Sequence, residues 1–399
     1  PDGTLASIDD LSNTEITGSI PQGGSVVSLV ISDGTNTITV DPNTIAIFPN
    51  GSFTTTVDTT GFDDGNISVN LVAQNSQGDT GTSTDTIYKD TVTDVEIDPL
   101  NVVNGEVPVV TGTGEPGATV VVSVDDGTGK SELGRATVNT NGDWSFTPTN
   151  AIDPSFEVIA DATDEWGNID DISRNIPSLD TGATVEVDES GLAIGSDAGN
   201  QPIEVNSSFT LGGTDAIQHI VVDGTTVTKA ELEDLAANPV TIIQGHYTVE
   251  LTGYNSATGE VNYTYTLTDA VAHDAPTGGS ESDQNIAQQS IQVSVVDTNG
   301  DTRTGEIAVE IKDDVPSAPV ADAAVSVEEG AASVGSANSG DNLLANDTLG
   351  ADGGQVHDIT YVDRAGDTQT NIGVPATGLT VDTQYGELTV NQDGSWSYT

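Results

Sequence analysis

The sequence is 399 residues long and strongly acidic, with 63 Asp and Glu against 8 Lys and Arg and a formal net charge of -55. Because the eight cations are scattered singly, the chain offers no basic patch, and neither nucleic acid nor an anionic membrane is expected as a partner. Hydrophobic content of 35% with 4% aromatics favours small all-β cores, and the absence of Cys fits a cytosolic protein or an exported one without disulfides. No segment approaches the length of a membrane span, and no amino-terminal signal peptide is recognisable, so we expect no direct membrane insertion.

Two stretches near the start of the chain repeat each other at a spacing of about 90 residues. ITGSIPQGGSVVSLVISDG begins at Ile16 and VTGTGEPGATVVVSVDDG at Val110, while NGSF at Asn50 corresponds to NGDW at Asn141. Short alternating strands separated by Gly, Asn and Asp turns fill both copies. The period is the size of an immunoglobulin-like sandwich, so we predict β-sandwich domains at residues 1–92 and 93–181.

A larger β-sandwich domain is predicted at residues 182–316. KAELEDLAAN at residues 229–238 is the one good helix candidate, and the Gly/Ser/Asp-rich stretch 269–284 is predicted to be an exposed loop. The domain ends in two alternating strands and an acidic linker, VSVVDTNGDTRTGEIAVEIKDDVPSAP. A fourth sandwich begins after it, at residues 317–399, and its last hairpin (GELTVNQDGSWSYT) reaches the end of the chain. We expect this domain to be truncated and the parent protein to continue.

Several of these motifs resemble a family of giant bacterial adhesins. GEPGATVVVSV, NGDWSFTP and ATDEWGN are similar to bacterial Ig-like repeats, and DTNGDTRTGEIAVEIKDDVP is similar to a repeat of RTX-type, type I-secreted adhesins. NLLANDTLGADG and YGELTVNQDGSWSYT resemble VCBS and bacterial cadherin-like repeats, whereas the glycine-rich RTX nonapeptide is absent from this sequence. The resemblance covers nearly the whole chain.

The resemblance implies an all-β fold of tandem Ig-like/cadherin-like β-sandwich domains in an extended rod, made rigid by extracellular Ca2+. It also implies secretion by a type I system, an extracellular location at the cell surface, and a part in cell adhesion and biofilm formation. The expected partners are neighbouring domains of the same long chain, in a monomer, together with a surface glycan or protein as external ligand.

Calcium takes six to eight oxygen ligands, so acids in turns and linkers are the candidate ligands. If Val120–Val124 is the second strand of the second domain, two of its turns lie at the end that faces the first domain, one with Asp125 and Asp126 and the other with Asp164 and Asn168. The linker acid Asp90 and the first-domain acids Asp63 and Asp64 are expected at the same end. The opposite end would then hold Glu115, Asp153 and Asp180. For the third joint we expect Asp313 and Asp314, joined by Glu328, Asp347 or Asp352, while Asp297, Asn299 and Asp301 are expected in a loop within the third domain.

For each of these acids, a solvated turn residue that hydrogen-bonds its own backbone is the alternative interpretation. Ligation is favoured for the linker acids because they recur at equivalent positions and calcium there would join two domains. The DTNGDT turn is not an EF-hand, since its sixth position is Thr302 and its twelfth Ala308.

No enzymatic motif stands out: the four His are far apart in the sequence, and HExxH, GxSxG and P-loop patterns are absent. Trp144 and Trp396 recur in the same turn as Phe53, which favours packing over sugar stacking, whereas Trp166 is the better candidate for exposure. The leading hypothesis is a calcium-stiffened extender segment of an adhesin. The alternatives are a carbohydrate- or protein-binding module in the 182–316 domain, and accessory domains of a polysaccharide-degrading enzyme.

Overall fold

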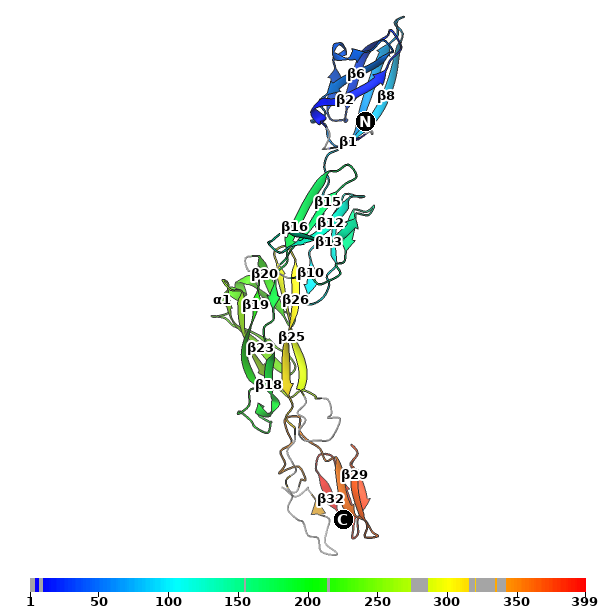
Figure 1. The fold of residues 1–399 in the computed structure, drawn as a ribbon. Coiled ribbons are helices and arrows are strands. Elements are labelled where there is room, and N and C mark those ends of the chain that lie inside the picture. Colours follow the sequence, from blue (N-terminus) through cyan, green and yellow to red (C-terminus); the bar gives the residue numbers. More distant parts are fainter. Residues whose placement is uncertain are drawn as a thin grey trace. The chain divides into compact units, whose positions relative to one another are not determined.

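The computed structural model describes residues 4–6, 10–153, 156–213, 216–273, 286–315, 320, 334–335 and 342–399. The chain divides into two compact units: Pro1–Ile176 with Asn299–Thr302, and Pro177–Thr298 with Arg303–Thr399. Strands make up nearly all of the regular structure in the described residues (Figure 1), so the all-β prediction is confirmed. The described residues contain no helix long and apolar enough to span a bilayer.

The first unit begins with a sandwich of two sheets that we call the first sandwich. Its five-stranded sheet has the order β1-β8-β7-β3-β4, and its three-stranded sheet has the order β2-β6-β5. The strands are β1 (Thr4–Ala6), β2 (Thr14–Ser19), β3 (Ser25–Ser32), β4 (Thr37–Val40), β5 (Ala46–Ile47), β6 (Ser52–Val57), β7 (Gly65–Gln74) and β8 (Thr80–Asp90). Alternate residues of β3, including Leu29 and Ile31, are fully buried between the sheets, as the period-2 pattern predicts.

The second sandwich follows after a short linker. A three-stranded sheet, β14-β11-β9, packs against a four-stranded sheet, β13-β12-β15-β16. The strands of this part are β9 (Val95–Ile97), β10 (Asn101–Val103), β11 (Val110–Gly114), β12 (Thr119–Asp125), β13 (Lys130–Thr137), β14 (Asp143–Phe146), β15 (Glu157–Thr163) and β16 (Ile169–Asn175). Val110, Val120, Val122 and Val158 are completely buried in its core.

The sequence repeat corresponds to a repeated contact between a glycine and an aromatic ring. Gly18 on β2 lies opposite Phe53 on β6, and Gly112 on β11 lies opposite Trp144 on β14. Both rings are buried, Phe53 at 4% and Trp144 at 3% exposure, so the packing role predicted for Trp144 is confirmed. A Cβ atom at Gly112 would lie 2.7 Å from the Trp144 ring and 1.9 Å from the carbonyl oxygen of Glu96, so a larger residue does not fit there.

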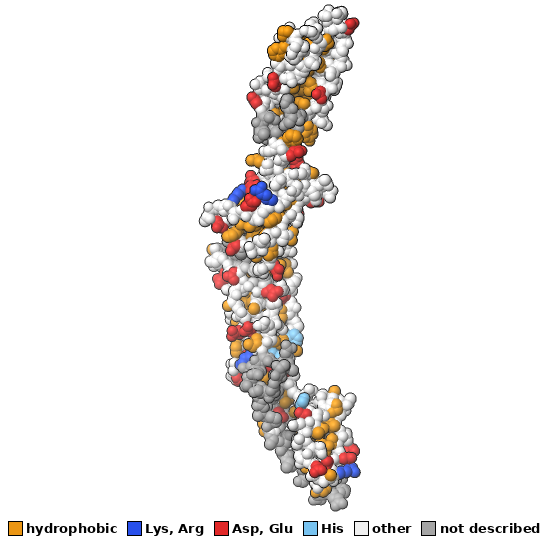
Figure 2. Space-filling model, turned by 45° about the vertical axis from the view of Figure 1, so that its right-hand side comes forward, with side chains coloured by type: hydrophobic (Ala, Val, Ile, Leu, Met, Phe, Trp, Pro, Cys, Tyr) orange, Lys and Arg blue, Asp and Glu red, His pale blue; other side chains and the backbone are white. Residues whose placement is uncertain are grey.

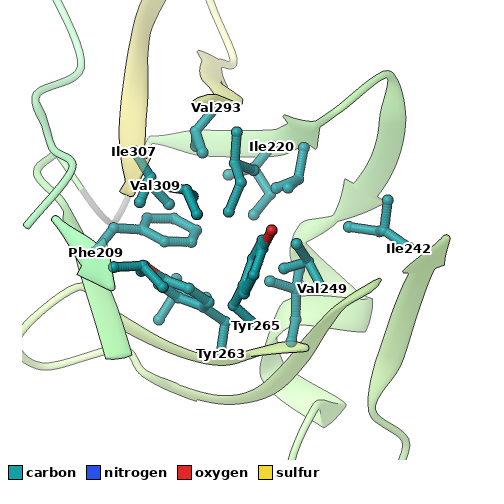
Figure 3. Packing of buried hydrophobic residues seen from close by; sticks show 14 of the residues in the cluster. Phe209, Ile220, Ile242, Val249, Tyr263, Tyr265, Val293, Ile307 and Val309 are labelled. Carbon is teal, nitrogen blue, oxygen red and sulfur yellow. The ribbon is translucent and has the colours of Figure 1, made fainter. Parts of the chain in front are cut away.

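The second unit contains a larger third sandwich. Its sheets have the orders β17-β19-β24-β23-β22 and β26-β25-β20-β21, and β18 pairs in parallel with β26. The strands are β17 (Leu179–Asp180), β18 (Val185–Asp188), β19 (Glu204–Leu211), β20 (Ile217–Val222), β21 (Thr225–Thr228), β22 (Val240–Ile243), β23 (Tyr247–Asn255), β24 (Glu260–Leu267), β25 (Ile286–Asp297) and β26 (Thr302–Lys312). Figure 3 shows side chains of both sheets pointing toward one another, with Phe209, Tyr263 and Tyr265 beside Val293 and Ile307.

The predicted helix is present and shorter than expected, because α1 spans Lys229–Asp234. Thr228 and Glu231 form a capping box that satisfies its first amides, and Leu232 is buried. After it, the described carboxyl-terminal residues form two small sheets, β27-β32-β31-β30 and β28-β29. These strands are β27 (Val334–Gly335), β28 (Asp358–Val362), β29 (Thr368–Gly373), β30 (Leu379–Asp382), β31 (Glu387–Val390) and β32 (Trp396–Tyr398).

Candidate metal centre

Acidic side chains are spread over the face in view in Figure 2, with few Lys and Arg between them. Most of these carboxylates are exposed, and exposure alone gives them no special chemistry. Three acids in the first unit differ because they are withdrawn from solvent and lie close together: one carboxylate oxygen from each of Asp90, Glu115 and Asp164 is within 4.8 Å of the other two. We call this group the linker acid cluster.

Each member of the linker acid cluster is held by a strand end or a turn. Asp90 is the last residue of β8, and Glu115 lies in the GEPG turn between β11 and β12, where the amide of Ala118 donates to its carbonyl oxygen. Asp164 begins the turn between β15 and β16, and its Oδ1 accepts hydrogen bonds from the amides of Trp166 and Asn168 at 2.8 and 2.9 Å. The two turns lie at the same end of the second sandwich, because β12 and β15 are antiparallel and Thr119 pairs with Thr163.

Asn168 connects two of these acids. Its Nδ2 donates to Asp164 Oδ2 at 2.7 Å, and to the carbonyl oxygen and Oδ1 of Asp90 at 3.1 and 3.2 Å. Asn168 is 2% exposed, so these bonds are made away from water, where a lost hydrogen bond is costly. The side chain therefore fixes the end of β8 against the second sandwich.

The electrostatics of the cluster are unfavourable without a cation. Burial raises the pKa of Asp90, and the charges of Asp164, Asp64 and Glu165 raise it further. Burial also raises the pKa of Glu115, where the charges of Asp90 and Asp164 act in the same direction. Like charges brought together in a poorly hydrated place favour their neutral forms unless a positive charge neutralises them.

The donor set fits a calcium ion. Oxygens on opposite sides of Ca2+ lie about 4.6–5.2 Å apart, so three oxygens within 4.8 Å of one another can reach a single ion. Oε2 of Glu115 is buried and, among the described residues, has no hydrogen-bond partner, which leaves it available as a ligand. Asp90, Glu115 and Asp164 would therefore hold the ion, with three hard carboxylate groups of the kind that Ca2+ prefers.

The linker itself is bonded to the first sandwich as well. The amide of Thr91 donates to Asp64 Oδ2 at 2.8 Å, and its hydroxyl donates to Asp64 Oδ1 at 2.9 Å. Lys89 Nζ lies 3.6 Å from Asp64 Oδ1 and donates to the carbonyl oxygen of Phe62. Asp64 is thus engaged by the residues on both sides of Asp90, whereas exposed Asp63 donates its amide to Asp33 Oδ2.

The predicted arrangement of the second sandwich was wrong by one strand. Val120–Val124 belongs to β12, the third strand of this sandwich in chain order, and Asp125 pairs with Glu157 at the end opposite Asp164. Asp125 and Asp126 therefore lie away from the linker acid cluster, where Asp126 Oδ1 accepts from the amide and hydroxyl of Thr128. Glu115, expected at the far end, belongs to the cluster instead.

The two other acids that were expected beside Glu115 do not join it. Asp153 is exposed and precedes β15, and its carbonyl oxygen accepts from the amide of Phe156. Asp180 is exposed on β17, where its Oδ1 accepts from the amide of Gly182 at 3.0 Å. The Asp180 carboxylate thus makes the local backbone bond that turn acids commonly make.

Asp297, Asn299 and Asp301 were expected in a loop within the third domain, and they lie at the turn between β25 and β26 of the third sandwich. Residues Asn299–Thr302 belong to the first compact unit. Asp301 is completely buried there, with Oδ1 accepting from the amide of Leu100 at 2.7 Å and Oδ2 lying 3.4 Å from Arg174. Asn299 is exposed, and Asp297 is buried at the end of β25.

The acids expected at the third joint separate into different surroundings. Asp314 accepts from the amide and hydroxyl of Ser196, and Asp347 Oδ1 accepts from the amide of Val320. Asp313 lies with Glu189 and His273 in a second group of possible ligands, and the charge of exposed Asp352 acts on it. Glu328 lies outside the described residues, as do residues 274–284 of the predicted exposed loop.

Sequence reasoning missed Glu189 and His273. Glu189 is completely buried, and the His273 side chain is 4% exposed and lies against it. The local sequence around His273, VAHD, contains no metal-binding motif. The two residues that lie near it in the fold, Glu189 and Asp313, are distant in the sequence. Trp166, expected to be exposed, is half-buried.

Comparisons with known proteins agree with this architecture. The bacterial Ig-like domain family matches residues 89–181. No curated protein matches the chain. The chain is therefore an all-β protein with tandem Ig-like β-sandwiches, one of which has a bacterial Ig-like sequence.

Similar solved structures include bacterial adhesins and a fragment of titin. One concerns host cell surface retention of a 1.5-MDa bacterial ice-binding adhesin, at 18% identity and a TM-score of 0.28, covering 78% of this chain and 95% of that one. Another is a tetra-tandem repeat in the extending region of a large adhesion protein, at 18% identity and a TM-score of 0.21, covering 99% and 89%. The I67–I69 fragment of titin follows at 12% identity and a TM-score of 0.31, covering 77% and 94%. Similarities at these scores carry no inference about function.

Proposed function

We propose that this chain is a non-catalytic extender segment of a secreted bacterial cell-surface adhesin, stiffened by Ca2+ at the linker between its first two sandwiches. The observation that carries the proposal is the linker acid cluster, in which Asp90 at the end of β8 meets Glu115 and Asp164. Two of the three come from turns of one sandwich, and the third comes from the strand that leads into the linker. An ion bound there would hold the linker to the second sandwich.

The physical effect of the ion follows from the charges. Two carboxylates about 4 Å apart repel each other by about 1 kcal/mol in water, and by more where solvent is excluded. Calcium replaces this repulsion with attraction, and it binds only when the cluster is assembled. Binding to the folded state alone therefore adds free energy of unfolding, about 2.7 kcal/mol when the free calcium concentration is one hundred times Kd.

The wider setting of the proposal rests on the match of residues 89–181 to bacterial Ig-like domains and on the sequence motifs. We infer four domains, at 1–92, 93–181, 182–316 and 317–399, within a longer monomeric chain whose neighbouring domains are its main partners. Export by a type I system, a location at the cell surface, and a role in adhesion and biofilm formation belong to the same proposal. The segment holds an adhesive domain away from the cell.

Calorimetry of the whole chain tests the calcium site. After treatment with EDTA, addition of millimolar Ca2+ should raise the melting temperature of the transition that contains the second sandwich. Glu115→Gln should abolish most of this increase, because it removes one charged ligand and keeps the shape of the side chain. Since Oε2 of Glu115 has no hydrogen bond to lose, the variant should fold normally.

The matched control is Glu106→Gln, which changes an exposed glutamate of the same sandwich. It should keep the full response to calcium, both in melting and in the heat of binding measured by titration. A calcium response that is equal in wild type and Glu115→Gln would refute the linker site. Unchanged melting of the wild type in EDTA and calcium would refute the stiffening function as a whole.

A further inference from the structure

A second group of potential metal ligands, one buried and two half-buried, lies in the second unit, and its chemistry differs from that of the linker acid cluster. Glu189 follows β18 directly, His273 comes a few residues after β24, and Asp313 follows β26. One ligand atom from each of these three residues is within 4.8 Å of the other two. The three segments are far apart in the sequence and meet at this point.

Glu189 is oriented by one oxygen and leaves the other without a hydrogen bond. The residue is 0% exposed, and its Oε1 accepts from the amide of Val271 at 2.6 Å. Among the described residues, Oε2 has no hydrogen-bond partner. A buried carboxylate oxygen with no donor is costly, so a missing positive partner is the simplest physical account of it.

His273 shows the same deficiency. Its side chain is 4% exposed, and neither ring nitrogen has a hydrogen-bond partner in the described part of the chain. Nε2 lies 3.2 Å from Glu189 Oε2, yet neither atom forms a hydrogen bond within the described residues. Two ligands of one metal ion lie this close without bonding to each other, because each directs its lone pair at the ion and not at the other ligand.

The ligand types decide between metals. Calcium is bound by oxygen, whereas imidazole nitrogen suits zinc and other first-row transition metals. Ligand atoms on a tetrahedral zinc ion lie about 3.3 Å apart, since Zn–N and Zn–O bonds are about 2.0–2.2 Å. The observed distance of 3.2 Å between Nε2 and Oε2 agrees with that value.

We propose that Glu189, His273 and Asp313 bind a Zn2+ ion that fastens together the start of the third sandwich, the segment after β24 and the segment after β26. The site is separate from the calcium site and does not depend on the proposed function. Asp352 adds further negative charge, since it acts on both Glu189 and Asp313. Two carboxylates and one neutral imidazole leave a fourth position for water, and the amide of Val271 holds Glu189 in place from behind.

The test uses the whole chain and zinc itself. The protein is stripped with EDTA, transferred into buffer with millimolar Ca2+ to fill calcium sites, mixed with Zn2+ and passed through a desalting column, and the retained zinc is measured by mass spectrometry. Wild type should retain one equivalent of zinc. His273→Gln should lose it, and His357→Gln should retain it, because the His357 side chain is 85% exposed and its Nδ1 lies 2.8 Å from Asp358 Oδ2, away from the three ligands.

Glu189→Gln gives an independent check if His273→Gln folds poorly. Its amide oxygen keeps the bond from Val271 while the charge of the ligand is lost, so zinc should be lost from a protein with unchanged circular dichroism. Co2+ in place of Zn2+ should give visible absorption bands of a four-coordinate ion in wild type and His357→Gln only. Absence of retained zinc in wild type, or equal retention in His273→Gln, would overturn the proposal.

Discussion

At the scale of single residues, burial separates a few carboxylates from the many on the surface. Exposed turn acids such as Asp58 and Asp126 accept hydrogen bonds from Thr60 and Thr128, which lower their pKa values. Asp90 and Glu115 are shifted in the opposite direction by burial and by neighbouring acids. A carboxylate thus stabilises the fold where it accepts hydrogen bonds in an exposed turn, and it destabilises the fold where it is buried beside other carboxylates.

These opposite shifts predict how stability depends on pH when calcium is absent. Because the pKa values of Asp90 and Glu115 are raised in the folded protein, protonation of these two residues adds to the free energy of unfolding. This contribution is fully present at pH values below the ordinary carboxyl pKa range, and it is lost as pH rises through the raised pKa values. In EDTA, the melting temperature of the first unit should therefore fall between mildly acidic and neutral pH. With calcium present, the fall should disappear. Glu115→Gln should flatten the profile in EDTA, and an equally steep profile in that variant would contradict the assignment.

Some residue roles could be predicted from the sequence and others could not. The recurrence of Phe53 and Trp144 in the same turn was enough to predict packing, because a repeated motif reports a repeated local contact. The group of Glu189, His273 and Asp313 could not be found in this way. Its members lie on three separate segments, and the contact arises only when the third sandwich closes.

At the scale of secondary structure elements, the position of a strand in the chain order decides which end of a sandwich a turn occupies. Alternation predicted β12 correctly, but it gave no information on how many strands come before it. Two strands of this sandwich precede it, β9 and the weakly patterned β11, VTGTG. Because consecutive strands are antiparallel, an error of one strand moved Asp125 and Glu115 to the wrong ends.

The contact between β11 and β14 gives a prediction of its own. Gly112→Ala should destabilise the second sandwich by about 3 kcal/mol, since the added Cβ would clash with the Glu96 backbone and the Trp144 ring. Chemical denaturation followed by Trp fluorescence measures this. The control is Gly81→Ala on β8, where a Cβ meets nothing within 4 Å, and its effect should stay within about 0.5 kcal/mol. Equal effects of the two changes would show that the close packing around Gly112 does not contribute to the free energy of unfolding.

At the scale of the whole molecule, stability is divided among separate cores. Among the described residues, buried side chains form one cluster in each of the first three sandwiches, and the cluster of the third sandwich is the richest in aromatic rings. The sequence repeat accounts for the first two of these cores, because each repeat buries its own alternating face. The sequence predicted less about the carboxyl-terminal sheets, where half-buried positions outnumber buried ones in β31.

Hydrogen exchange should reveal this unevenness. Ile307, Val309 and Ile311 in β26 are at most 1% exposed, whereas β31 and β32 carry mostly half-buried or exposed residues. Amides of Leu388–Tyr398 should therefore exchange faster than those of Ile307–Ile311, because local opening costs less where little apolar surface is buried. Mass spectrometry of peptic fragments from the native chain compares the two segments directly. Equal, strong protection of both would mean that the carboxyl-terminal sheets are as stable as the third sandwich.

The parallel pairing of β18 with β26 has a mechanical consequence. β18 lies near the start of the third sandwich and β26 ends it, and Val185–Asp188 pair in register with Val309–Lys312. Tension that pulls the two ends of this sandwich apart would draw the strands past each other along their length, so the hydrogen bonds between them would carry the force together and not break one after another. The 2.9 Å ion pair between Lys312 and Asp188 lies across the same pair of strands and would resist the same sliding. A domain closed in this way should therefore unfold only when the tension is high.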